Sequence, residues 1–346
     1  MVARRLKKPK PPSRKGPRTK TGAKNSAKAG APFRKEAPKA PARPRPPKKM
    51  SRISRQLSEA GLRLKKGLGQ NFLVSQPHLK KIAESVGAHE DSLVLEIGCG
   101  LGNLTELLAQ DAGSVLAIEL DERFRSVHDQ ALAPLKNIAI IYGDFMEIDL
   151  PAILKKERRD ADIRVVGNIP YHLTSPILFK LIATPLDFDC ICLLMQQEVA
   201  VRLAAKPGSR HYGILAVKAG TRFKIENALT VPAGAFLPPP KIKSALARLT
   251  PREGGDLIPD ARERQFFFHF VDQAFAQRRK MLPKSVSAAS KGMIPREQVE
   301  AAMKAMGLET NLRAEQLSVE QFIELFQRLG KPELPAIRKD YSPTPE

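Results

Sequence analysis

The order of apolar and polar positions after residue 75 predicts strands and helices in alternation. Short β-prone apolar runs lie at residues 92–97, 114–119, 137–142 and 163–167. Segments with helical spacing of apolar residues lie among them, at residues 76–86, 104–110 and 121–132. Strands that alternate with helices form a largely parallel, doubly wound sheet with helices on both faces. The pattern therefore predicts an α/β protein.

The pattern changes in the last third of the chain. Further helix and strand candidates continue at residues 177–182, 191–195, 198–204 and 213–217. Residues 251–259, with Gly254 and Gly255, then interrupt it and indicate a linker. Beyond the linker the spacing is helical, at residues 261–281, at residues 296–306, and from a capping box at residues 318–321 to Gly330. A small all-helical C-terminal domain at residues 260–330 is predicted.

Five phenylalanines within the predicted helix at residues 261–281 lie on overlapping helical faces. Aromatic residues in this arrangement form a hydrophobic core more often than a base-stacking surface. We therefore expect them to be buried.

Composition narrows the class of protein. The chain has 346 residues, of which 42% are hydrophobic, and no run approaches the ~18 apolar residues of a membrane span. Three cysteines, Cys99, Cys190 and Cys192, are too few and too badly spaced for a disulfide framework or a zinc site. Cys190 and Cys192 are expected as buried strand residues. We expect a cytoplasmic protein that binds no metal and does not associate with a membrane.

The net charge of +22 is unevenly distributed. Residues 1–50 hold 18 Lys and Arg, one acid (Glu36) and 10 prolines, whereas the rest holds 40 basic and 35 acidic residues. Such a segment cannot bury enough apolar surface to offset its ordering entropy, so a disordered tail is predicted. Its charge favours an RNA or ribosomal partner. A solvated tail without a specific role and a mitochondrial transit peptide remain alternatives, although the prolines disfavour the amphipathic helix of the latter.

Glycines and acids follow the predicted strands. The first strand runs into Gly98 and Gly100, which let the backbone approach a ligand closely. By itself this turn also fits a nicotinamide site. The second strand ends in Glu119, a carboxylate that can accept both hydroxyls of a ribose, and the third leads to Asp144, which can accept the amino group of a cofactor adenine. Together they predict a nucleotide cofactor at the carboxyl ends of the strands.

The fourth strand leads into Asn168-Ile169-Pro170-Tyr171. The N6 amine of adenine is a poor nucleophile because its lone pair is delocalised into the ring. The Asn168 oxygen and a carbonyl at Ile169 or Pro170 can accept its N–H groups and direct the lone pair at a methyl group. Pro170 fixes the backbone, and Tyr171 offers a face on which a base can stack, worth ~1–3 kcal/mol. The segment predicts methyl transfer to an adenine amine.

From about residue 65 to 330 the chain resembles the small-subunit ribosomal RNA adenine N6,N6-dimethyltransferases, relatives of the macrolide-resistance methylases of large-subunit RNA. The resemblance rests on residues 69–73, 96–102, 168–171, 196–199, 212–213, 236–245, 275–280 and 313–318. It implies a Rossmann-like methyltransferase domain at residues 51–250, the helical domain at 260–330 as an RNA-binding domain, and a flexible C-terminal tail at 331–346.

The resemblance also implies roles for single residues. Asn71 and Leu73 would contact the methionine end of S-adenosylmethionine, and Gly98 would lie beneath it. Glu119 would bind the ribose, Asp144 the cofactor adenine, and Asn168 would lie near the transferred methyl. The resemblance implies four catalytic residues, Asn168, Pro170, Tyr171 and Phe236, with Tyr171 and Phe236 enclosing the target base.

The function implied is dimethylation of two adjacent adenosines in the 3′-terminal hairpin loop of small-subunit ribosomal RNA during ribosome biogenesis. S-adenosylmethionine is the expected methyl donor. The expected partners are that RNA and the assembling small subunit, bound by a monomer, with Arg278, Arg279 and Lys280 as a phosphate-contacting patch. The alternatives are a large-subunit adenine methylase of the macrolide-resistance type and a non-catalytic ribosome assembly factor on the same fold. A nicotinamide oxidoreductase would leave Tyr171 and Phe236 unexplained.

Overall fold

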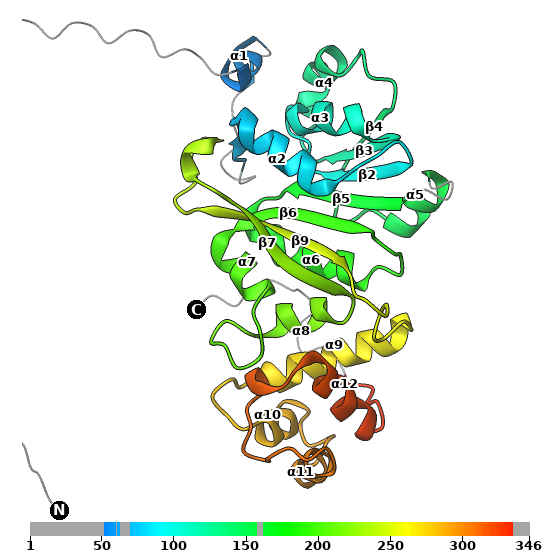
Figure 1. Cartoon of the computed structure of the whole chain (residues 1–346), viewed down its shortest axis with the longest axis vertical. Coiled ribbons are helices and arrows are strands. Elements are labelled where there is room, and N and C mark those ends of the chain that lie inside the picture. The colour runs from blue at the N-terminus through cyan, green and yellow to red at the C-terminus, as the bar shows by residue number, and fades with distance from the viewer. Residues whose placement is uncertain (1–51, 60, 63–69, 158–161, 335–346) are drawn as a thin grey trace, which may run out of the picture. The chain divides into compact units, whose positions relative to one another are not determined.

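A mixed sheet of seven strands forms the centre of the described chain (Figure 1). The structure, a computed structural model, describes residues 52–59, 61–62, 70–157 and 162–334. The predicted disordered tail at residues 1–50 and residues 335–346 of the predicted C-terminal tail lie outside these residues. The strands follow the order β4-β3-β2-β5-β6-β9-β7.

Five neighbouring strands run parallel and form the doubly wound part of the sheet. They are β2 (Ser92–Ile97), β3 (Ser114–Glu119), β4 (Ile138–Tyr142), β5 (Asp162–Asn168) and β6 (Cys190–Gln196). Strand β2 pairs with β3 on one side and with β5 on the other, so the strand order reverses there. Ligands bind at such a reversal, beyond the carboxyl ends of the strands. Cys190 and Cys192 are fully buried on β6, as predicted.

Two antiparallel strands, β9 (Ser244–Pro251) and β7 (Phe223–Val231), complete the sheet beyond β6. The sequence patterns predicted neither strand. Their addition keeps the sheet mostly parallel, and the α/β prediction is confirmed.

Helices cover both faces of the sheet. Alternate residues of a strand face opposite sides, so Val94 packs with one set of helices while Leu93 and Leu95 pack with the other. The first set is α2 (Gln76–Val86) and α3 (Asn103–Asp111). The second is α5 (Leu150–Glu157), α6 (Thr174–Ala183), α7 (Gln197–Leu203) and α8 (Ile214–Gly220).

The C-terminal helices share the core of that second face (Figure 1). They are α9 (Ala261–Phe275), α10 (Leu282–Ala289), α11 (Arg296–Ala305) and α12 (Val319–Arg328). Four of the five phenylalanines predicted as core are at most 6% exposed, and Phe266 is partly buried. Ser318 caps α12 through the predicted capping box with Gln321. Helix α9 ends six residues before the predicted boundary at 281, and α10 was not predicted.

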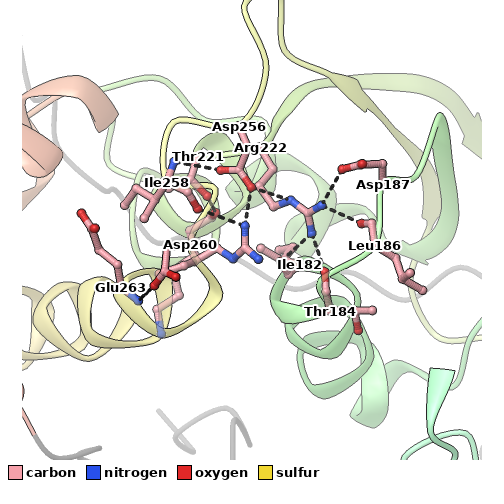
Figure 2. Close-up of polar contacts among 12 residues, drawn as sticks. Ile182, Thr184, Leu186, Asp187, Thr221, Arg222, Asp256, Ile258, Asp260 and Glu263 are labelled. Atoms are coloured by element: carbon pink, nitrogen blue, oxygen red, sulfur yellow. Dashed lines mark hydrogen bonds and ion pairs between the residues drawn. The ribbon is translucent and has the colours of Figure 1, made fainter. Parts of the chain in front are cut away.

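The segment predicted as a linker is fixed by buried charges (Figure 2). Arg222 Nε lies 3.1 Å from a carboxylate oxygen of Asp256, and Arg264 of α9 donates to the same oxygen. The remaining donors of Arg222 reach the carbonyl groups of Ile182, Thr184 and Leu186 at the end of α6, at 3.0, 2.8 and 2.6 Å. Asp256 therefore joins the start of the helical region to the sheet's helices.

Two short strands form a second sheet. Strand β1 (Phe72–Leu73) pairs antiparallel with β8 (Phe236–Leu237). Phe72 packs with Ile53 and Leu57 of α1 (Arg52–Glu59) and with Phe124, whose ring centroid lies 5.8 Å away. None of the described helices has the length and apolar character that a membrane crossing needs.

Candidate functional site

A pocket of about 1250 Å³, counted with its open mouth, lies at the carboxyl ends of the parallel strands. Its wall includes the last residues of β2, β3 and β5 (Ile97, Glu119 and Asn168). Eight of the nine predicted site residues line it: Asn71, Leu73, Gly98, Glu119, Asp144, Asn168, Pro170 and Tyr171. Strand order alone brings most of them together, because parallel strands end at one edge of the sheet.

Phe236 is the predicted site residue that the structure leaves out of the pocket wall. It is 3% exposed and lies opposite Leu73 in the β1–β8 pair, within the core that covers one face of the sheet. A base could stack on its ring only after the side chain had moved. The order of residues in the motif gave no information on this burial.

The glycine turn after β2 has the conformation that its sequence demands. Gly98, Gly100 and Gly102 have φ values of 74°, 58° and 79°, which residues with a Cβ rarely adopt. At Gly100 a Cβ would come within 2.8 Å of the Phe72 ring. The turn therefore passes closely beneath residues 70–73, which are held in turn by a 3.0 Å hydrogen bond from Gln70 to Asp121.

The Gly100 residue is fixed from both sides. Its N–H donates to Glu119 Oε2 at 2.8 Å, and its carbonyl accepts from His128 Nε2 at 2.7 Å. The other ring nitrogen of His128 lies 2.8 Å from the Tyr142 hydroxyl. Burial lowers the pKa of His128, which favours a neutral ring that donates through Nε2 and accepts at Nδ1. Sequence patterns gave no sign of this support, because His128 belongs to no motif.

Two buried acids make the pocket suitable for a cationic ligand. Burial raises the pKa of Glu119, whose oxygens accept from the N–H groups of Gly100 and Asp121. Burial also raises the pKa of Glu96 to about 7, and the nearby charge of Glu119 adds to this. Glu96 Oε2 is buried without a hydrogen-bond partner among the described residues. Among the described residues that line the pocket there is no Lys, Arg or His.

The two buried acids fit S-adenosylmethionine, which carries a sulfonium and an ammonium group. An unpaired carboxylate oxygen is an acceptor for such a cation. The described residues contain no group of three or more His, Cys, Asp or Glu side chains placed to hold a metal ion.

The loop after β4 brings Asp144 into the wall of the pocket. Asp144 Oδ1 accepts the Met146 N–H at 2.8 Å, which stabilises the turn. Met146 and Leu120 also line the pocket and are 36% and 48% exposed. Apolar side chains so exposed gain from contact with a flat ring, such as that of a purine.

The Asn168 side chain has a defined orientation. Its amide nitrogen donates to the Asn71 carbonyl oxygen at 2.9 Å, so the amide oxygen is the group left to accept from a ligand. The Tyr171 hydroxyl lies 2.7 Å from Ser244 Oγ at the start of β9. Burial raises the pKa of Tyr171, so the hydroxyl stays neutral. The pocket therefore presents an oriented acceptor beside an aromatic ring.

The predicted phosphate patch, Arg278, Arg279 and Lys280, is exposed just beyond α9. Arg278 also makes contacts within the protein. Arg278 donates to the carbonyls of Arg210 and Tyr212 and to the Glu315 carboxylate. These bonds brace neighbouring loops, which gives Arg278 a structural part alongside any contact with phosphate.

Comparison with known proteins gives consistent matches over most of the chain. The family model described as Ribosomal RNA adenine dimethylase matches residues 61–331. Ribosomal RNA small subunit methyltransferase A of Shouchella clausii is 38% identical over 274 residues, covering 79% of this chain and 92% of the relative. The protein of that name from Levilactobacillus brevis is 40% identical over 263 residues, covering 75% and 88%.

Solved structures agree on the fold. A dimethyladenosine transferase from Plasmodium falciparum has a TM-score of 0.64 and 26% identity, covering 74% of this chain and 97% of that chain. The 23S rRNA methyltransferase ErmE has a TM-score of 0.57 and 26% identity, covering 75% and 99%. The predicted methyltransferase fold is confirmed.

Proposed function

The chain belongs to the ribosomal RNA adenine dimethylase family, and from this membership we propose that it transfers methyl groups from S-adenosylmethionine to the N6 amines of adenosines in small-subunit ribosomal RNA. The observation that carries the proposal for this site is the orientation of Asn168, whose amide nitrogen is engaged by Asn71 and whose oxygen is left to hold an amine. The targets are two adjacent adenosines in the 3′-terminal hairpin loop, each of which receives two methyl groups.

The cofactor-binding residues divide the pocket between the parts of the donor. S-adenosylmethionine supplies an electrophilic methyl group on its sulfonium. Asn71, Leu73 and Gly98 line the part of the pocket that would hold the methionine end, and the unpaired oxygen of Glu96 would accept from its cationic group. Glu119 would accept the ribose hydroxyls, and Asp144 would accept the purine amine; both line the pocket.

The target base binds at the turn after β5. Tyr171 stacks on the adenine, and the Asn168 oxygen and the carbonyl of Ile169 or Pro170 accept the two N6 hydrogens. This pulls the nitrogen toward tetrahedral geometry and directs its lone pair at the methyl carbon. The N6–C bond would form as the C–S bond of the donor breaks, and the nitrogen would then lose a proton. Positioning supplies most of the rate, so no strong base is needed first.

The partners follow from this substrate. We propose that the chain acts as a monomer on the assembling small subunit in the cytoplasm. Residues 51–250 would form the catalytic domain and residues 260–330 the RNA-binding domain. The large-subunit alternative is not favoured, because the curated relatives at 38–40% identity are named for the small subunit.

Asn168→Ala tests the proposal. Methyl transfer from labelled S-adenosylmethionine to small-subunit particles that lack the modification should fall by roughly 10²–10³-fold, the usual cost of removing one transition-state acceptor or donor. Cofactor affinity and the unfolding midpoint should change little. Asn227→Ala, at an exposed position of β7, is the matched control and should keep full activity.

Two results would contradict the proposal. Near-normal turnover by Asn168→Ala at saturating RNA would remove Asn168 from the reaction. Digestion of the product and mass spectrometry should yield N6,N6-dimethyladenosine from small-subunit RNA, and modification of large-subunit RNA alone would point to the alternative.

A further inference from the structure

Lys180 of α6 donates to three carbonyl groups of one short segment. Its ammonium nitrogen lies 2.7 Å from the oxygen of Phe145, 2.9 Å from that of Met146 and 2.6 Å from that of Ile148. An ammonium has three N–H donors, so these contacts use all of them. The carbonyls belong to the loop that begins with Asp144, which lines the pocket.

The three carbonyl dipoles converge on a single point, which is unfavourable unless a cation lies there. The helix that supplies the cation is held independently, since Ile177, Leu178, Leu181 and Ile182 are at most 2% exposed. Packing therefore holds helix α6 in place, and Lys180 fixes the loop relative to this helix.

The opposite side of the same loop faces the ligand pocket. Asp144, Phe145 and Met146 all line it, and the Asp144 carboxylate is oriented by the Met146 N–H. At its other end, α6 begins directly after the turn Tyr171–Leu173, which follows Asn168. One helix thus carries the turn for the target base at its start and the support for the Asp144 loop near its end.

We propose that Lys180 is a positioning residue, which holds the Asp144 loop so that the pocket selects a cofactor purine with an exocyclic 6-amino group. The proposal rests on the proposed function, because it assigns Asp144 to the cofactor purine. Lys180 is not among the residues that line the pocket. It acts through the three carbonyls.

The test compares two ligands on the full-length protein by calorimetry. S-adenosylhomocysteine carries the 6-amino group, whereas S-inosylhomocysteine has an oxygen there, which a carboxylate repels. The wild-type chain should bind the adenosyl compound at least about tenfold more tightly, the usual worth of one hydrogen bond to a charged group. Lys180→Met keeps the length of the side chain and removes its donors, so this ratio should fall to within about twofold of one.

The controls separate positioning from general damage. If Lys180 had a merely structural role, Lys180→Met would lower the affinity for both ligands equally and leave the ratio unchanged. That result would overturn the proposal. Lys224→Met, at an exposed position of β7, should keep the wild-type ratio. Lys180→Gln, which retains a short donor, should give an intermediate ratio and serves if the methionine variant folds poorly. Asp144→Ala should also bring the ratio of the two affinities close to one. The double variant with Lys180→Met should lower this ratio no further.

Failure of this inference is distinguishable from failure of the proposed function. If the wild-type chain binds neither compound, the proposed function fails. If it binds both with a clear preference that Lys180→Met retains, only the role of Lys180 fails.

Discussion

At the scale of single residues, the side chain of Asn168 shows how a local contact decides chemistry. An asparagine amide can offer either its oxygen or its nitrogen to a ligand. The Asn71 carbonyl can only accept, so it engages the nitrogen of Asn168 and leaves the oxygen for the amine. The partner is 97 residues away in the chain, and it fixes the polarity of the pocket.

Substitutions at Tyr171 should separate its ring from its hydroxyl. Tyr171→Ala removes the stacking surface and should lower kcat/KM for RNA by about 5- to 150-fold, given ~1–3 kcal/mol per stacked base. Tyr171→Phe loses only the hydrogen bond to Ser244 and should keep much of the activity. Ser244→Ala removes the same bond from the other side and is the matched control. Equal damage from the alanine and phenylalanine variants would show that the hydroxyl matters.

Glu96 predicts how stability depends on pH. Its pKa rises from 4.5 to about 7 in the folded chain. Because the pKa of Glu96 is higher in the folded chain than in the unfolded chain, its contribution to the free energy of unfolding is complete below pH 4.5. This contribution is lost as pH rises to about 7. Glu96→Gln avoids this loss, which is about 3 kcal/mol for such a shift, because glutamine does not ionise. Its unfolding free energy relative to wild type should therefore rise by about that amount between pH 4.5 and 8.

Urea unfolding without cofactor across this pH range measures the effect of Glu96→Gln. A difference from wild type that stays constant with pH would contradict the raised pKa of Glu96.

The sequence predicted the site residues that follow strand ends and missed those that support them. Glu119, Asp144 and Asn168 each stand at or just after the end of a parallel strand, so topology alone brings them together. His128 and Lys180 lie on helices and act through backbone carbonyls of distant segments. No periodicity or motif marks such contacts, because any nearby donor could serve.

At the scale of elements, amphipathic helices and buried strands were predictable, whereas the sheet edge was not. Strand β7 has five exposed residues among its nine and a register shift between Asn227 and Leu229, so it lacks the regular alternation of a half-buried strand. Helix α10 begins at Leu282, directly after the predicted helix at residues 261–281, and its eight residues were assigned to no element. In both cases tertiary packing determined the element.

The loop predicted as a linker should prove important for stability. Asp256→Asn removes the carboxylate that pairs with the buried Arg264 and leaves Arg222 with only the exposed Asp187, which should cost about 3–5 kcal/mol of unfolding free energy. Asp187→Asn is the matched control: its carboxylate also lies near Arg222, at 3.6 Å, but is 94% exposed, so its loss should cost at most ~1 kcal/mol. Urea denaturation of the two variants measures both, and equal effects would mean that the buried cluster contributes no more than a surface ion pair.

At the scale of the whole molecule, charge is divided between a pocket lined by acids and a strongly basic N-terminal segment. The pocket is suited to a cationic cofactor, but its Glu96, Glu119 and Asp144 repel the phosphates that accompany the target base. Residues 51–346 carry 40 basic and 35 acidic residues, so their net charge of +5 offers little long-range attraction. Attraction to RNA must come from local patches or from residues 1–50.

Deletion of residues 1–50 should therefore preserve the chemical step and weaken association with RNA. The segment carries 18 basic residues and one acid, and a chain of that charge can neutralise several phosphates. Each such contact adds ~0.7–0.9 to the slope of log affinity against log salt. The truncated protein should show a lower affinity for small-subunit particles at low salt, a flatter salt dependence and an unchanged single-turnover rate at saturating particles. Filter binding from 50 to 300 mM salt measures the first two. The same affinity and the same slope after truncation would make the segment a bystander, and unchanged binding with misplacement in the cell would make it an address.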